Sequence, residues 1–260
     1  MRTTTLAATA LASAALLGLT ACGTSGSGSD SGSSSASGSA AKPAAQKAPY
    51  ADLSGPQLLE KSLAATRKAT SMTVKGSVTE DKKPMTMELS LSTGDECRGS
   101  MATAGEGRFE LIKSKKNAYV KADEAFYRAA GKGEPKEQTD AVVKMLADRW
   151  MKSPADSPDA KDFTGICDLD ELLKEFEDNS GTAHKGAVTT VDGQQAVALT
   201  VPADGGTGTV YVAAKGEPFL LKAVQKDGDD PGEMTFSDFN RPVDTTPPAD
   251  KDVVDLSKLG

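Results

Sequence analysis

The sequence predicts an α+β domain in which helices cover the inner face of one curved antiparallel sheet of about ten strands. Alternating apolar and polar residues occur in two runs, residues 72–121 and 187–238, each long enough for about five strands. A helical signal precedes the first run, and two further helical patterns lie between the runs. Strands and helices segregated in this way along a chain are typical of the α+β class.

Residues 1–21 have the composition of a secretory signal peptide. Arg2 supplies the positive start, residues 6–19 are apolar, and small residues lead up to Cys22. A membrane-spanning helix is the alternative, but Ala, Ser and Thr outnumber Leu and Ile, and no basic cluster follows. Residues 22–50 are rich in Ser, Gly and Ala and are predicted to be a disordered tether. The folded domain is expected over residues 51–260.

The stretch that ends at Cys22 reads L-T-A-C and resembles the lipobox of bacterial lipoproteins. This resemblance implies that Cys22 receives a diacylglyceryl group and becomes the new N-terminus. Two or three acyl chains on one residue hold a protein on its membrane more firmly than a single chain. The expected location is therefore the extracytoplasmic face of the cell membrane, and an ordinary secretory signal remains the alternative.

Of the 3 cysteines, lipidation of Cys22 leaves Cys97 and Cys167. An exported protein lies in an oxidising compartment, which favours a disulfide between these two residues over two separate thiols, the alternative. The formal net charge of −7 and the lack of a basic block argue against nucleic acid as a partner.

The first helix of the domain is predicted within residues 53–70. Ser54 or Gly55 suits the cap, Pro56 suits the first turn, and Leu59 and Leu63 are expected to face the core. The first two strands place Met72, Val74 and Val78, then Met85, Met87, Leu89 and Leu91, on one face, with polar residues on the other, solvated face. Three short strands are predicted at residues 97–104, 108–113 and 117–121.

Two helices are predicted in the middle of the chain. Val142, Leu146 and Trp150 lie at i, i+4 and i+8, and Leu169, Leu172, Leu173 and Phe176 form a stripe behind a cap at Asp168. The second run predicts strands at residues 187–191, 196–201, 209–213, 218–225 and 233–238. Asp192-Gly193 is a strong signal for a two-residue hairpin.

The layout resembles that of the actinobacterial LppX/LprG-type lipoproteins, relatives of the LolA/LolB lipoprotein carriers. The resemblance rests on the lipobox, the tether, the two strand runs and the ending F-S-D-F-N-R-P-V-D-T-T-P-P, residues 236–248. It implies a half-barrel sheet closed by helices over a hydrophobic cavity, in which several members of the family hold acylated lipids. The expected ligand is then a lipid or lipoglycan, bound without chemical change.

Candidate residues for lining such a cavity come from the apolar faces of the first two strands and of the two middle helices. They are Met72, Val74, Met85, Met87, Leu89, Leu91, Val142, Leu146, Leu169, Leu172, Leu173 and Phe176. Methionines, Met101 included, suit a surface that must accept variable acyl chains, but they also fill ordinary cores. A surface module with a filled core that acts through unidentified protein partners is therefore the alternative function.

No catalytic, metal or cofactor site is predicted. The only histidine, His184, lies at a predicted strand start, and no G-x-S-x-G motif is present, so a triad hydrolase is not expected. Asp227, Asp229 and Gly232 match part of a calcium loop, but Pro231 and Asp238 occupy two other ligand positions, and a hairpin turn is favoured. The protein is therefore not expected to be an enzyme.

Overall fold

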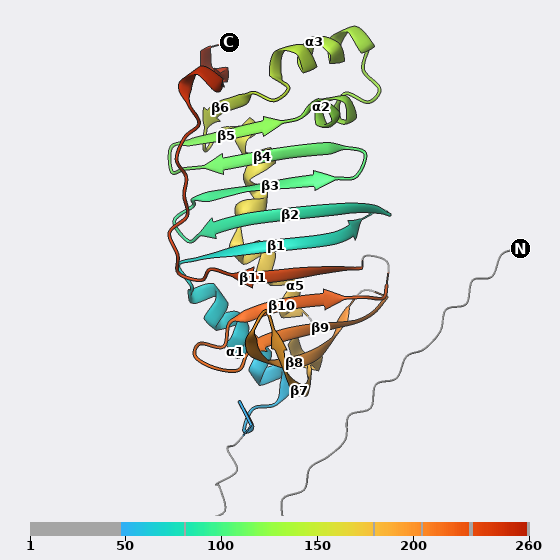
Figure 1. Cartoon of the computed structure of the whole chain (residues 1–260), viewed down its shortest axis with the longest axis vertical. Coiled ribbons are helices and arrows are strands. Elements are labelled where there is room, and N and C mark those ends of the chain that lie inside the picture. The colour runs from blue at the N-terminus through green and yellow to red at the C-terminus, as the bar shows by residue number, and fades with distance from the viewer. Residues whose placement is uncertain (1–47, 81, 179, 204, 229–230, 259–260) are drawn as a thin grey trace, which may run out of the picture. The chain divides into compact units, whose positions relative to one another are not determined.

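The computed structural model describes residues 48–258, except residues 81, 179, 204, 229 and 230. These residues form one curved, unclosed sheet of 12 strands with helices on its inner face, which confirms the expected α+β half-barrel (Figure 1). The strand order is β12-β6-β5-β4-β3-β2-β1-β11-β10-β9-β8-β7. Neighbouring strands are antiparallel, except that β12 runs parallel to β6.

The strands of the first run are β1 (Ser71–Glu80), β2 (Lys83–Ser92), β3 (Cys97–Thr103), β4 (Gly107–Lys113) and β5 (Asn117–Ala122). Those of the second run are β7 (His184–Val191), β8 (Gln194–Ala203), β9 (Gly206–Ala213), β10 (Leu220–Gln225) and β11 (Gly232–Ser237). Both runs are as expected. The sheet is extended by β6 (Trp150–Pro154) and β12 (Val253–Asp255), which were not predicted.

The helices are α1 (Gly55–Lys68), α2 (Glu124–Ala130), α3 (Lys136–Leu146), α4 (Pro158–Thr164) and α5 (Leu169–Asp178). Short 3-10 turns are Gly165–Cys167, Ser180–Thr182, Asp250–Asp252 and Leu256–Lys258. Figure 1 shows α1 and α5 on the same side of the sheet, which we call the inner face, and α2 and α3 at one end. Within the described residues, none of these helices combines the length and the apolar character needed to cross a bilayer.

The predicted start of α1 is confirmed in detail. Ser54 Oγ accepts a hydrogen bond from Gln57 N (3.4 Å), and Ser54 N donates to Gln57 Oε1 (2.9 Å), so the helix begins with a capping box. Leu59 and Leu63 are buried, as expected from their spacing. The Asp192-Gly193 hairpin is also confirmed, since both residues have positive φ angles, 46° and 81°, as a two-residue turn requires.

The predicted helical stripe through Trp150 is wrong. Helix α3 ends at Leu146, and Trp150 is the first residue of β6. Asp148 turns the chain with a φ of 59°, and its N–H donates to Ala122 O at the end of β5 (2.9 Å). The helix therefore ends four residues earlier than the apolar spacing suggests, and Trp150 belongs to the sheet.

The segment after β11 passes over the outer face at the start of β1. Asn240 N donates to Ser71 O (2.9 Å), Asn240 Oδ1 accepts from Thr70 N (2.8 Å), and Phe239 stacks on Phe219 with ring centres 4.1 Å apart. Thr73, expected on the solvated face, is consequently buried. The ending that carries the family resemblance thus has a structural role here.

Candidate functional site

The two cysteines of the domain form a disulfide, which confirms the prediction. Cys97 begins β3 and Cys167 immediately precedes α5, with Cα atoms 5.8 Å apart. Asp168 Oδ1 accepts from the N–H groups of Asp170 (3.0 Å) and Glu171 (3.1 Å), as expected of a cap. The start of α5 is therefore fixed to the sheet. Cys22, the predicted lipidation site, lies outside the described residues.

A second contact holds α5 along its length. Arg67 on α1 forms ion pairs with Asp170 (3.5 Å) and with Glu177 on α5. The hydrogen bond from Arg67 lowers the pKa of the Glu177 carboxyl below its ordinary value. The two inner-face helices are thus joined to each other and, through the disulfide, to β3.

Half of the predicted lining residues are buried in the hydrophobic core beneath α1 and α5. These six residues are Met72, Val74, Leu89, Leu91, Leu169 and Leu173. Met87, Leu172 and Phe176 are half-buried and pack against that core, and the Phe176 ring meets Phe236 edge-on at 6.1 Å. Side chains therefore fill this part of the half-barrel.

The remaining predicted lining residues lie toward the margins of the fold. Met85 is half-buried near the start of β2, and Leu146 is half-buried at the end of α3. Val142 on α3 is 37% exposed, and its neighbour Met145 is 48% exposed. Because no described side chain of α3 is buried, this helix does not form a wall opposite the sheet.

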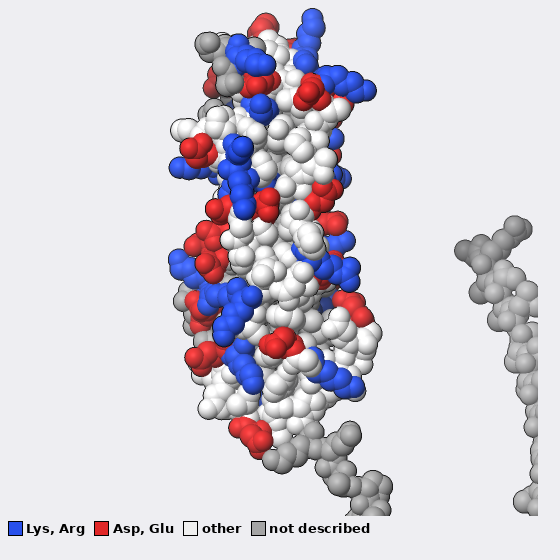
Figure 2. Space-filling view, turned by 90° about the vertical axis from the view of Figure 1, so that its left-hand side faces the viewer, with Lys and Arg blue, Asp and Glu red and all other residues white. Residues whose placement is uncertain are grey.

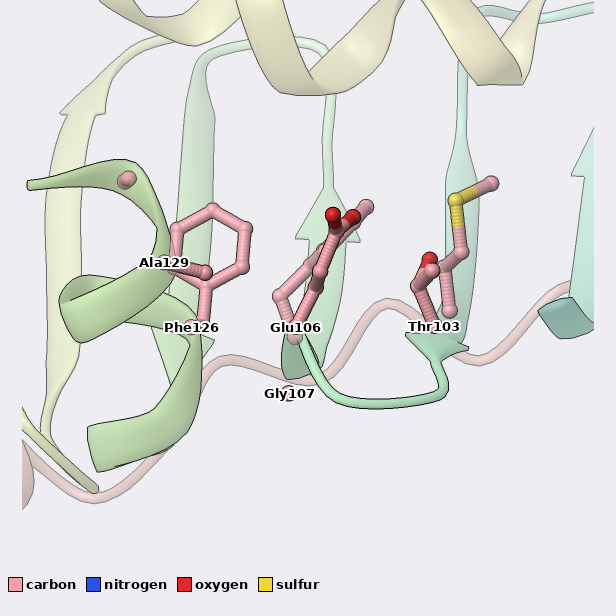
Figure 3. Close-up of a pocket in the computed structure, with 8 residues that line it drawn as sticks. Thr103, Glu106, Gly107, Phe126 and Ala129 are labelled. Carbon is pink, nitrogen blue, oxygen red and sulfur yellow. The ribbon is translucent and has the colours of Figure 1, made fainter. Parts of the chain in front are cut away.

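A pocket of about 270 Å³ lies where α2 meets the β3–β4 hairpin. Figure 3 shows Phe126 on α2, and Thr103 and Glu106 on the hairpin, projecting toward the same space. Polar and apolar atoms contribute about equally to the lining, which consists of Met101, Thr103, Glu106, Gly107, Phe109, Phe126, Ala129 and Ala130. Ligand pockets typically hold about 300–1,000 Å³ and are lined mainly by apolar groups, so this pocket is smaller and more polar than most, with the rings of Phe109 and Phe126 as its main apolar surface.

Asp123 holds the two walls of the pocket together. Its Oδ1 accepts from Phe126 N (2.8 Å), which caps α2, and its Oδ2 accepts from Arg108 N in β4 (3.0 Å). Gly107 has a φ of 90°, and a Cβ at this position would overlap Phe126 N and Asp123 Oδ1. A glycine is therefore needed for α2 to approach β4 this closely.

Three aromatic rings from different elements meet beside the pocket. Phe109 on β4 contacts Phe126 (5.9 Å between ring centres) and Phe163 on α4 (5.7 Å), both in edge-on geometry. Phe126 and Phe163 are themselves 6.1 Å apart. Next to them, burial raises the pKa of the Tyr127 hydroxyl, which donates to the Met151 sulfur (3.4 Å). The ring cluster thus joins α2, α4 and the sheet.

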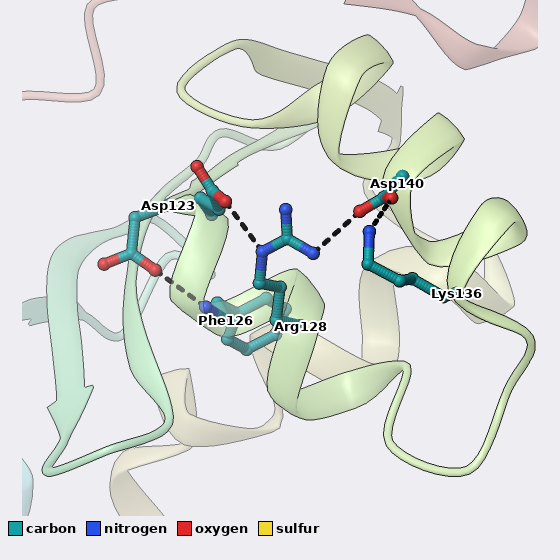
Figure 4. Close-up of polar contacts among 6 residues, drawn as sticks. Asp123, Phe126, Arg128, Lys136 and Asp140 are labelled. Atoms are coloured by element: carbon teal, nitrogen blue, oxygen red, sulfur yellow. Dashed lines mark hydrogen bonds and ion pairs between the residues drawn. The ribbon is translucent and has the colours of Figure 1, made fainter.

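Ion pairs connect α2 to α3 on the solvent side (Figure 4). Arg128 bonds Glu124 (Nε to Oε1, 2.7 Å) and Asp140 on α3 (2.9 Å), and Lys136 also pairs with Asp140. The hydrogen bonds from Lys136 and then Arg128 lower the pKa of the Asp140 carboxyl. At the mouth of the pocket, Glu106 pairs with Lys83 of β2. The pocket thus combines an ion pair with the apolar side chains of Met101, Phe109 and Phe126.

The residues considered for other chemistry do not gather into a site among the described residues. His184 is exposed at the start of β7. Asp227 and Gly232 flank the turn between β10 and β11, as the hairpin reading expected, whereas Asp229 lies outside the described residues. Basic and acidic side chains are interspersed over the face shown in Figure 2, which offers no extended basic area to a phosphate backbone.

The pocket residues on α2 were missed by the sequence analysis. A seven-residue helix with one capping aspartate, E-A-F-Y-R-A-A, is too short for its periodicity to stand out. Of the pocket lining, only Met101 was named in advance. The signals that could have found α2 are the Asp123 cap and the two apolar rings that follow it.

Comparison of the sequence with protein-family profiles and with curated proteins gives no match. Solved structures are similar in fold. LprF from Mycobacterium bovis has a TM-score of 0.53 at 16% identity over 78% of this chain and 100% of that chain. LppX from Mycobacterium tuberculosis has a TM-score of 0.46 at 18% identity over 74% and 100% of the two chains. The chain therefore has the fold of LprF, and this similarity establishes the fold alone.

Proposed function

We propose that this protein is an exported lipoprotein, anchored on the outer face of the cell membrane through Cys22, whose domain binds an amphiphile without changing it chemically. The lipobox and tether support the anchor, and the shared fold with mycobacterial lipoproteins supports the class. The observation that carries the binding role is the pocket between α2 and the β3–β4 hairpin, in which apolar side chains lie beside polar ones. Burial of acyl methylenes, at about 0.8 kcal/mol each, drives such binding.

The polarity of the pocket supports an amphiphile over a purely apolar ligand. Phe109, Phe126 and Met101 offer the acyl chain an apolar surface, while Glu106 and its partner Lys83 stand at the mouth. A ligand that inserts its chain and leaves its head group outside satisfies both parts of the site. No covalent step is needed.

Filling the pocket tests this proposal. The protein is the chain from residue 22 onward with Cys22→Ser, exported behind a secretory signal; we call it the unlipidated chain. Ala129→Leu adds a side chain to the pocket wall, and Ala141→Leu makes the same change on an exposed position of α3. Leucine suits both helices.

Ala129→Leu is expected to weaken binding of a fluorescent palmitate analogue at least about tenfold, since about two methylenes lose their contacts at ~0.8 kcal/mol each. Ala141→Leu should bind like the parent. Circular dichroism verifies that both variants are folded. Equal affinity in all three proteins contradicts the pocket as the binding site.

A second function, a surface module that acts through protein contacts, is favoured by one observation. Val142 and Met145 are exposed side by side on α3, which buries none of its described side chains. In that case the unlipidated chain binds no amphiphile, and a Val142→Asp/Met145→Asp variant loses a partner that wild type retains in a cross-linking experiment on intact cells.

A further inference from the structure

One row of inner-face residues runs straight across six neighbouring strands. Each member is the direct cross-strand partner of the next, which places their side chains on one face. The row is Phe109, Met101, Met87, Gly76, Met234 and Ala223, from β4 to β10. Five inter-strand steps give it a length of roughly 24 Å.

The row is the uncovered margin of the inner face. Met101, Met87 and Met234 are half-buried. Leu89 and Phe236, two residues further along the strands of Met87 and Met234, are buried in the core. On the opposite side the strands end at the polar rim near Glu106. One step further toward the rim, the apolar face continues only on β1 and β2, with the half-buried Val78 and Met85.

Gly76 is the low point of the row. A Cβ on this residue would lie 3.0 Å from Met234 Cγ and 3.3 Å from Met87 Cγ, so the two thioether side chains close over the glycine. Glycine in a strand interior commonly marks a close approach of another group. Methionine side chains are flexible and adapt to irregular apolar partners, so these two are suited to moving aside.

We infer that a single acyl chain lies across the strands along this row, with its polar head at the pocket mouth and its tail passing over Gly76 between Met87 and Met234. The inference rests on the proposed function and specifies its ligand as a single-chain amphiphile, such as a fatty acid or a lysophospholipid. The length of the row exceeds the thickness of one bilayer leaflet, about 15 Å, so the row is long enough for the acyl chain of a membrane lipid. The small volume of the pocket at its start favours one chain over two.

Gly76→Val tests the path, because valine suits a strand and its branched side chain would stand where the tail is inferred to pass. Gly186→Val is the matched control, since it makes the same change on exposed strand β7, away from the row. The unlipidated chain and both variants are titrated with octanoate and with palmitate by calorimetry, after delipidation. Thermal unfolding shows whether each variant is folded. If Gly76→Val does not fold, Gly76→Ala, which adds only one methyl group, takes its place.

The parent is expected to bind one palmitate per chain and to bind octanoate more weakly. Each methylene that loses its contacts weakens binding about fourfold, so displacing two costs about fifteenfold. Gly76→Val should show a loss of at least that size for palmitate and almost none for octanoate, whose tail stops short of Gly76. Gly186→Val should match the parent with both ligands.

The same titration separates the two proposals. Two palmitates per chain, or a Gly76→Val effect equal for both fatty acids or absent for both, overturns the path and leaves amphiphile binding in place. A parent protein that binds neither fatty acid overturns the proposed function as well.

Discussion

Removing the Cys97–Cys167 disulfide should destabilise the fold by a calculable amount. The bridge joins residues separated by 70 positions in the sequence, and a loop of that length restricts the unfolded chain by about 4.4 kcal/mol. For a domain of this size, 1 kcal/mol shifts Tm by roughly 2–4 °C, so the double substitution Cys97→Ala/Cys167→Ala should lower Tm by about 9–18 °C.

Thermal unfolding of the unlipidated chain, followed by circular dichroism, measures this shift. Reduced wild-type protein is the control, because it keeps both side chains and loses only the bond. Hydrogen exchange should also change locally. Relative to the oxidised wild type, loss of the bond should speed exchange of the α5 amides more than that of the β8 and β9 amides, since Cys167 holds the start of α5 to β3. A Tm that falls by less than about 3 °C in both the variant and the reduced protein refutes the reasoning.

Three other changes test the walls of the pocket. Gly107→Ala should destabilise by about 2 kcal/mol or more in urea unfolding, whereas Gly105→Ala, which also has a positive φ but open space around it, should cost less; equal losses contradict the close approach of α2. Asp123→Ala should cost about 1 kcal/mol through the lost cap, and an unchanged urea midpoint would show that the cap is unimportant. Asp140 has a lowered pKa in the folded state, so its ion pairs stabilise α3 at pH above the ordinary carboxyl pKa and cease to do so as pH falls through the lowered value. Asp140→Asn should therefore lower Tm at neutral pH but not in strong acid, and a pH-independent difference refutes that cause.

Most elements of the fold follow from sequence periodicity. The strands of both runs alternate apolar and polar residues, and α1 and α5 repeat leucines at helical spacing beside capping residues. These signals are local, so they can be recognised in the sequence without knowledge of the tertiary structure. The disulfide could be predicted because the expected oxidising compartment favours pairing of Cys97 with Cys167, whatever their distance in the sequence.

The elements that were missed depend on contacts distant in sequence. Trp150 continues the apolar spacing of α3, but a hydrogen bond from Asp148 to β5 draws the chain back to the sheet. Strand β12 has only three residues and exists through its pairing with β6, the other strand that was missed. Helix α2 depends on Asp123 bridging two elements. The pocket is built from such contacts, so its lining could not be read from the pattern of apolar residues.

Native mass spectrometry of the unlipidated chain, purified from an oxidising compartment without detergent and measured before and after organic extraction, tests the central claim most directly. The account predicts one bound amphiphile per chain, removed by the solvent, with the mass of a single-chain lipid. The same spectrum should show the loss of two protons that marks the disulfide. A bare protein mass that persists after incubation with envelope lipids contradicts the account.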